Sequence, residues 1–108
     1  MNVYAMKYLN FSEIHLQFQE NYGVFGNEWR ILRFITKTYI CDNTPLRVQN
    51  LIDKSEIASP ATIHRIMKTL ISKDLVKLVT DECDGRVKYI EPTSLAIKLF
   101  NEIGRRMK

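Results

Sequence analysis

Cysteine is scarce in this sequence, which leaves a disulfide framework and a metal site unsupported. Only Cys41 and Cys83 occur among the 108 residues, and neither belongs to a CxxC pair or lies near a histidine pair. Both are most simply interpreted as reduced thiols. We therefore expect no metal-binding residues.

Long apolar runs and targeting signals are also missing. No stretch approaches the roughly 20 apolar residues that span a bilayer. Residues 2–7 lack the basic start, the apolar run and the small-residue cleavage site of a signal peptide. We therefore expect a cytoplasmic protein without a membrane partner.

Enzyme motifs are absent as well. His15 and His64 are the only histidines, and the sequence contains neither a glycine-rich phosphate loop nor a nucleophile motif. Cys83 has no base that the sequence reveals. We predict that the protein is not an enzyme and has no catalytic residues and no cofactor.

Positive charge, in contrast, is in modest excess. The chain has 16 Lys and Arg against 12 Asp and Glu, which gives a net charge of +4 and a pI near 9.2. This balance suits a polyanion-binding protein, although charge alone identifies no partner. The length and the 45% hydrophobic content predict one compact domain over residues 1–108 with a real core.

The most informative stretch is a basic helix predicted over residues 59–73. Ser59 can accept a hydrogen bond at the helix start, and Pro60 suits the first helical position, where no N–H is needed. Three- and four-residue spacing predicts one apolar face, made of Ile63, Ile66, Met67, Leu70 and Ile71. The other faces are small, hydroxylic and basic, and no carboxylate occurs in the stretch.

This outer surface suits a helix that enters a DNA groove. Short residues near the N-terminus let the backbone approach, and helix-end N–H groups favour phosphate. Arg and Lys supply contacts to phosphates or guanine edges. The alternative is a solvated surface helix without a ligand.

A helix-turn-helix arrangement is predicted around this stretch. Residues 46–53 predict a short helix whose inward face is Leu46, Val48, Leu51 and Ile52. Residues 54–58 form a tight connection in which Ile57 is a plug. In such a pair the first helix crosses the DNA backbone and the second lies in the major groove.

A wing is predicted directly after the basic helix. Residues 76–80 and 86–91 are predicted strands, and the Asp-Gly pair at 84–85 is a strong hairpin-turn signal. Arg86 and Lys88 lie on the second predicted strand, where they can reach a minor groove or phosphates.

Three acids near the wing tip oppose this assignment, because Asp81, Glu82 and Asp84 should repel DNA. The alternatives are a solvated acidic hairpin and a wing that points away from DNA. The hairpin can still be a DNA-binding wing if Asp84 pairs with an arginine and orients the arginine side chain.

The other segments predict scaffold helices. Residues 1–22 show both helical spacing and strand-like alternation, and we favour a helix. The helical spacing places an aromatic stripe on this helix, consisting of Tyr4, Tyr8, Phe11, His15, Phe18 and Tyr22. This stripe belongs either to the core or to a surface that packs against a second copy of the protein. We expect His15 to be a packing or hydrogen-bonding residue.

The helix ends carry their own signals. Asn27 can cap a helix over residues 28–40, whose broad apolar surface includes Tyr39 and Ile40, and residues 41–45 follow as a loop. Asp74 is a plausible end of the basic helix. A last helix starts at Thr93 or Ser94, either of which can cap it.

The order of these elements and several residues resemble the MarR-type winged-helix transcription regulators. The resemblance runs over residues 28–100. It rests on Trp29-Arg30-Ile31-Leu32, on residues 62–67 of the basic helix, on Leu75-Val76, on Asp84-Gly85-Arg86, and on Ile90 and Thr93.

The resemblance implies DNA contacts from Ser59, Thr62, His64 and Arg65. It also implies an Arg86 that enters the minor groove, with Asp84 as its orienting acid. Members of the family act as homodimers on near-palindromic operators, usually as repressors and often released by a small-molecule effector.

Several features depart from the family pattern. Asp74, Leu78, Pro92 and Ala96 stand where the family commonly has Gly, Arg, Leu and Gly. The sequence to Lys108 also lacks the extra C-terminal helix that usually helps to build the dimer. We therefore expect the N-terminal helix, residues 1–22, and the last helix to supply any dimer contact.

These observations predict a winged helix-turn-helix fold, mainly α with a small β-hairpin, in a sequence-specific double-stranded DNA-binding transcription regulator. We expect a repressor. The predicted DNA contacts are Ser59, Ala61, Thr62, His64, Arg65, Lys68, Arg86 and Lys88, with Arg30 or Arg47 adding backbone contacts.

The alternative function is a winged-helix protein-protein interaction adaptor without DNA binding. Such an adaptor would bind polymerase or another regulator through the aromatic N-terminus. The small net charge and the acidic wing favour it.

Overall fold

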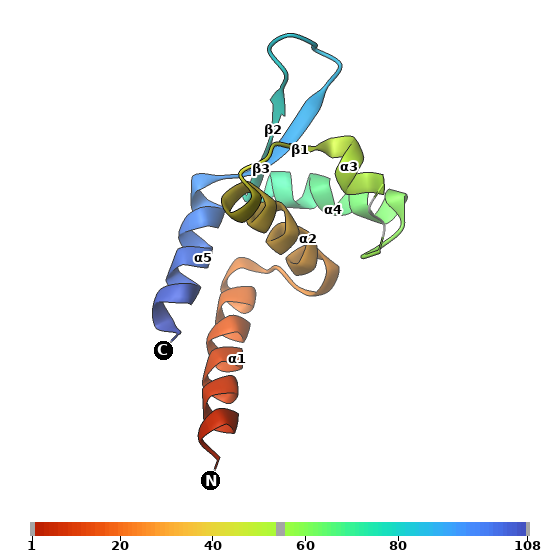
Figure 1. Cartoon of the computed structure of the whole chain (residues 1–108). Helices are drawn as coiled ribbons and strands as arrows, with labels where there is room; N and C mark the ends of the chain where they lie inside the picture. Colours follow the sequence, from red (N-terminus) through yellow and green to blue (C-terminus); the bar gives the residue numbers. More distant parts are fainter. Residues whose placement is uncertain (1, 54–55, 108) are drawn as a thin grey trace.

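The computed structural model describes residues 2–53 and 56–107. Met1, Lys54, Ser55 and Lys108 lie outside this part, so the predicted connection before the basic helix is described only from Glu56 on. The described residues form, in chain order, α1 (Val3–Tyr22), α2 (Gly26–Lys37), the π-helical turn η1 (Thr38–Asp42), β1 (Leu46–Arg47), α3 (Val48–Asp53), α4 (Pro60–Ser72), β2 (Val76–Thr80), β3 (Lys88–Pro92) and α5 (Ser94–Arg106) (Figure 1).

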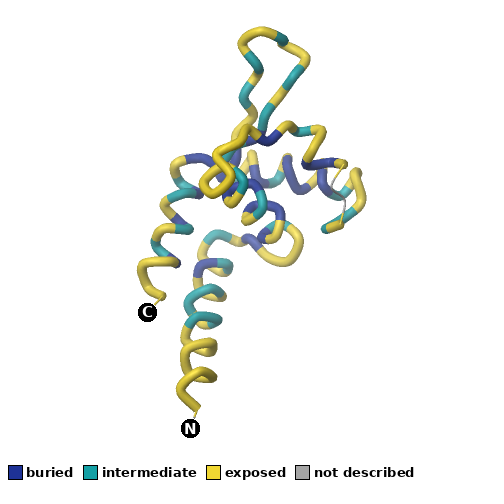
Figure 2. Tube along the Cα trace, viewed as in Figure 1, coloured by how far each residue is buried: buried dark blue, intermediate teal, exposed yellow. Residues whose placement is uncertain are grey.

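The predicted winged helix-turn-helix fold, mainly α with a small sheet, is confirmed. The core lies where α2, α4, α5 and the sheet meet, and the tip of the β2–β3 hairpin and the first turns of α1 are exposed (Figure 2). The largest side chains with less than 2% exposure include Ile31, Leu32, Ile35, Leu70, Ile90 and Leu99. Their apolar spacing explains why these segments pack as helices and strands around one core.

Two junctions hold α4 and α5 at fixed positions. Asp74 has φ 59°, the left-handed conformation predicted for the end of the basic helix. Thr93 caps α5 by accepting a hydrogen bond from the Ala96 N–H at 3.2 Å, and its hydroxyl donates to the Asp74 carbonyl at 2.7 Å. One buried threonine therefore joins the end of α4 to the start of α5.

The region around α2 corrects three predictions. Asn27 does not cap the helix, because α2 already begins at Gly26 and Phe25 occupies the N-cap position. The chain also continues helically to Asp42, so Cys41 and Asp42 do not belong to the loop. Tyr39 and Ile40 are 43% and 52% exposed, since the wider π turn rotates them away from the side that buries Ile35.

The sheet has three antiparallel strands in the order β1-β3-β2. Leu46 and Arg47, predicted as the start of a helix, instead pair with Ile90 and Tyr89 of β3. Helix α3 is therefore shorter than predicted. Residues 86 and 87, predicted as strand, lie in the loop before β3, which pairs with β2 from Lys88↔Thr80 to Pro92↔Val76.

Helix α1 extends away from the core as an arm, and the strand alternative for residues 1–22 is wrong. Phe18 near its end is buried, whereas Tyr4 and Tyr8 are 85% and 66% exposed. The predicted stripe thus divides into a core half and an exposed half.

A lysine joins this arm to the basic helix. The Lys73 ammonium, just after α4, donates to the Gly23 carbonyl at 2.6 Å and forms an ion pair with Glu28 at 3.1 Å. Within the described part of the chain, no helix is both long enough and apolar enough to cross a membrane.

Candidate nucleic-acid interface

The start of α4 is organised by Ser59. Its Oγ accepts a hydrogen bond from the Thr62 N–H at 3.3 Å and donates to the Thr62 Oγ1 at 3.0 Å. Pro60 follows at the first helical position, as predicted. Ser59 and Thr62 are therefore held together at the positive end of the helix dipole.

Helix α4 buries one face and exposes the other. The buried face consists of four residues that are each at most 4% exposed, namely Ile63, Ile66, Met67 and Leu70. Ile71, predicted on this face, is 37% exposed. The predicted contact residues Ala61, His64, Arg65 and Lys68 are exposed, and Thr62 is half-buried. Because α4 contains no acid, nothing on the helix itself neutralises Arg65 and Lys68.

An acid of the wing has a structural role that sequence reasoning missed. Asp81 accepts hydrogen bonds from the N–H groups of Cys83 and Asp84, at 2.8 and 3.2 Å, and from the Tyr89 hydroxyl at 2.9 Å. The Cys83 N–H, the Tyr89 hydroxyl and the Asp84 N–H, in that order, hold the pKa of the Asp81 carboxyl below its ordinary value. Asp81 thus stabilises the conformation of the wing loop by accepting three hydrogen bonds.

The second acid of the wing binds the wing arginine. Asp84 Oδ1 accepts hydrogen bonds from the Arg86 backbone N–H at 3.0 Å and from Arg86 Nε at 3.3 Å. The Arg86 side chain nevertheless remains 92% exposed. The predicted pairing of Asp84 with an arginine is present, and it is made with Arg86 itself. Glu82 is exposed.

The predicted contact residues fall into two groups. Six lie on or directly before α4, and two lie on the wing, which projects from the helical body (Figure 1). Arg86 lies in the loop near the wing tip, because β3 begins only at Lys88, which is also exposed.

Arg47 and Tyr89 belong to the same region. The sequence predicted a DNA-backbone contact for Arg30 or Arg47 and no role for Tyr89. Arg47 and Tyr89 are opposite one another in the β1–β3 pairing. Because β1 is only two residues long, its sequence shows no strand periodicity.

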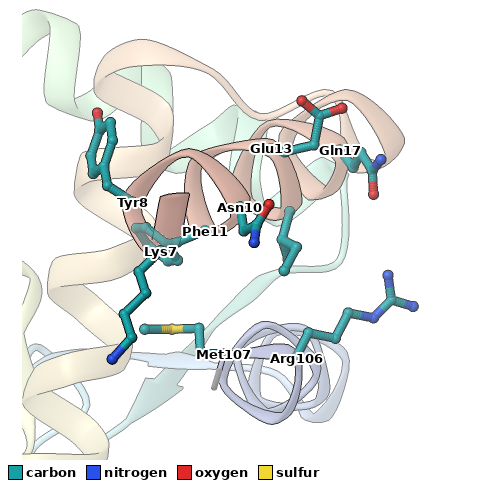
Figure 3. Close-up of a pocket in the computed structure, with 9 residues that line it drawn as sticks. Lys7, Tyr8, Asn10, Phe11, Glu13, Gln17, Arg106 and Met107 are labelled. Atoms are coloured by element: carbon teal, nitrogen blue, oxygen red, sulfur yellow. The ribbon is translucent and has the colours of Figure 1, made fainter. Parts of the chain in front are cut away.

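A second surface feature lies between α1 and the end of α5. It is a groove of about 630 Å³. In Figure 3, Arg106 and Met107 lie across the groove from the side chains of α1. The groove is lined by Lys7, Tyr8, Asn10, Phe11, Glu13, Ile14, Gln17, Arg106 and Met107. None of the predicted DNA contacts lines this groove.

His15 lies beside this groove in an aromatic cluster, which agrees with a packing role. Its ring stacks on Phe11 at 5.7 Å and lies 4.7 Å from the ring of Trp29, measured between centroids. Burial lowers the pKa of the His15 imidazole. The ring therefore packs between α1 and α2, and its Nε2 is buried without a hydrogen-bond partner among the described residues.

Comparison with known proteins finds similarity in structure but not in sequence. No protein-family model matches the chain, and no curated protein sequence matches it. Three solved structures illustrate the structural similarity. The Staphylococcus aureus MepR–DNA complex superposes with a TM-score of 0.72 at 20% identity, over 99% of this chain and 86% of that one.

The other two are named as transcription regulators. Tm0710 from Thermotoga maritima has a TM-score of 0.69 at 16% identity, over 98% of this chain and 68% of that one. A MarR-like regulator from Bacillus cereus has a TM-score of 0.61 at 11% identity, over 97% and 68%. At these identities the similarity demonstrates a shared fold.

Proposed function

Since the chain has the fold of the MarR-type winged-helix regulators, we propose that it is a sequence-specific double-stranded DNA-binding regulator of transcription that uses no enzyme chemistry. The observation that carries this proposal is the exposed side of α4. This side presents small, hydroxylic and basic residues without a carboxylate, on a helix whose other side is anchored in the core. The MepR structure, which has this fold, is a DNA complex.

In this proposal α4 enters the major groove. Thr62, His64, Arg65 and Lys68 meet base edges or phosphates, while Ser59 and Ala61 let the helix end approach the backbone closely. Arg86 enters the minor groove from the wing, oriented by Asp84, and Lys88 binds phosphate. The ion pair with Asp84 leaves Arg86 exposed, so the acid does not remove it from DNA.

We further propose that the regulator is a homodimer and acts as a repressor on an inverted repeat. The exposed half of α1 supports the dimer, because Val3, Tyr4, Met6, Tyr8 and Leu9 are 50–85% exposed along one helix. Apolar surface of this extent on a protruding helix is typical of an interface. A two-fold dimer matches two half-sites about one helical turn apart.

The first experiment is binding of the purified protein to random-sequence duplex DNA over a salt series, followed by selection of preferred sites. Tight binding that weakens with salt and enriches an inverted repeat is the expected result, because phosphate contacts release counterions. Absence of binding at low salt would refute the proposal.

An adaptor that binds another protein through α1 is the second candidate function, and the same exposed apolar residues support it. It differs from the regulator in its response to salt. An adaptor retains its protein partner at about 0.5 M salt and has no affinity for duplex DNA at low salt.

A further inference from the structure

A basic notch lies at the root of the wing, between the β1–α3 corner and the hairpin. Its volume is about 270 Å³, and it is lined by Arg47, Val48, Gln49, Arg86, Val87 and Lys88. Three of these six residues are cationic and none is acidic. All three cations are exposed, so the notch is accessible to an anion from solvent.

The strand register explains how residues distant in the sequence meet there. Pairing of Leu46 with Ile90 and of Arg47 with Tyr89 brings β1 against the start of β3. Lys88 is the first residue of β3, and Arg86 precedes it by two positions. The notch therefore exists only when β1 is paired with the wing.

A hydrogen bond holds one of the three cations in place, and the strand pairing fixes the backbone of another. Tyr89, which is opposite Arg47 in the β1–β3 pairing, donates to Asp81 at 2.9 Å, and Asp81 in turn accepts from the backbone of the wing loop. Asp84 orients Arg86 at 3.3 Å. Neither acid lines the notch. The Arg86 side chain and the Arg47 backbone are thus positioned in advance, which reduces the entropy lost when an anion binds.

We propose that this notch binds a phosphodiester group of duplex DNA, with Arg47 as a contact residue outside both α4 and the wing hairpin. Guanidinium groups suit this ligand because their fixed N–H donors match the oxygens of a phosphate. The inference rests on the proposed function and adds a backbone contact that sets the register of the wing on the duplex.

The test compares wild type, Arg47→Ala and Arg47→Lys by fluorescence anisotropy with a short duplex over a salt series. Arg47→Ala should weaken binding roughly tenfold or more, as expected for one lost hydrogen bond to a charged group. It should also reduce the slope of log K against log salt by about one, equally for all sequences. Arg47→Lys should retain the slope.

Two further variants separate position from charge. Tyr89→Phe keeps all three cations but removes the hydroxyl that joins β3, opposite Arg47, to Asp81, so it should weaken binding without changing the salt slope. Arg33→Ala removes an exposed arginine of α2 and should change neither quantity. Thermal melting of each variant checks that it is folded.

The possible failures are distinguishable. If the wild type does not bind duplex DNA at low salt, the proposed function fails. If the wild type binds and folded Arg47→Ala binds with unchanged affinity and slope, the function stands and the notch inference is wrong. A third outcome is that Arg47→Ala loses the NMR response of the wild type to inorganic phosphate and still binds duplex DNA as tightly as the wild type. In that case the notch is a site for free phosphate, which also overturns the inference.

Discussion

The exposed side chains of α4 differ in what each can contribute at a DNA surface. The Thr62 hydroxyl already accepts a hydrogen bond from Ser59 at 3.0 Å. Arg65 is exposed, and its side chain makes no ion pair within the described part of the structure. Its five N–H donors are therefore available for a base edge or a phosphate.

Arg65→Ala should lower the affinity for a selected operator by about 1–3 kcal/mol if Arg65 reads a base, and should relax the preference at one position of the site. Competition binding with operators altered at single base pairs measures both effects. Arg33→Ala on α2 is the matched control. Unchanged operator affinity in Arg65→Ala would remove this residue from the interface.

Asp81 makes the shape of the wing dependent on pH. In the folded protein the pKa of the Asp81 carboxyl is lowered from its ordinary value of 3.8. The stabilisation that the ionised carboxylate contributes is therefore complete above pH 3.8. The contribution is lost as the pH falls through the lowered pKa. The wing should therefore loosen only in strong acid, and it should keep one conformation through neutral pH.

The amide NMR signals of Cys83 and Asp84 should report this change, because both groups donate to Asp81. Asp81→Asn should abolish the acid transition of these two signals. A transition that persists unchanged in Asp81→Asn would show that another group controls the wing loop.

At the scale of elements, α4 depends on its N-cap. Ser59→Ala removes the side-chain acceptor for the Thr62 N–H and should cost about 0.5–2 kcal/mol of unfolding free energy, measured by urea denaturation. Ser94→Ala is the matched control, because Ser94 is the first residue of α5 while Thr93 caps that helix. Equal losses in the two variants would contradict the capping role.

At the scale of the whole molecule, the arm formed by α1 is the surface through which we propose that two copies meet. The molecule measures 57 × 25 × 22 Å, and its N-terminal turns lie far from the wing (Figure 1). A dimer through this arm leaves α4 and the wing free on each protomer. The proposed DNA-binding and dimerising surfaces are therefore separate.

Tyr8→Glu and Leu9→Glu should convert the proposed dimer to a monomer, because each places a charge on exposed apolar surface of α1. Sedimentation measures this change. Both variants should also lose affinity for an inverted repeat more than for a single half-site. Tyr39→Glu, at a residue 43% exposed in η1, is the control and should remain dimeric. A wild type that sediments as a monomer bound to DNA would contradict the proposed dimer.

Local signals in the sequence were sufficient for most of the fold. Ser59 with Pro60, Asp74 and Thr93 each mark a helix end through the chemistry of one or two neighbouring residues. The apolar spacing of α4 depends on helix geometry, and it predicted four of the five inward residues correctly, since only Ile71 is exposed. These features were predicted correctly because the forces that produce them act within a few residues of the chain.

Other features depend on contacts between distant segments, and only the tertiary structure decided them. The Asn27 cap failed because α2 begins a residue earlier, and Leu46 with Arg47 became a strand because β3 offered them partners. The sequence presents Asp81 as an acid that should repel DNA, whereas in the fold it accepts a hydrogen bond from Tyr89, eight residues away. Cross-strand register is a property of two segments together, so neither segment alone encodes the wing network or the basic notch.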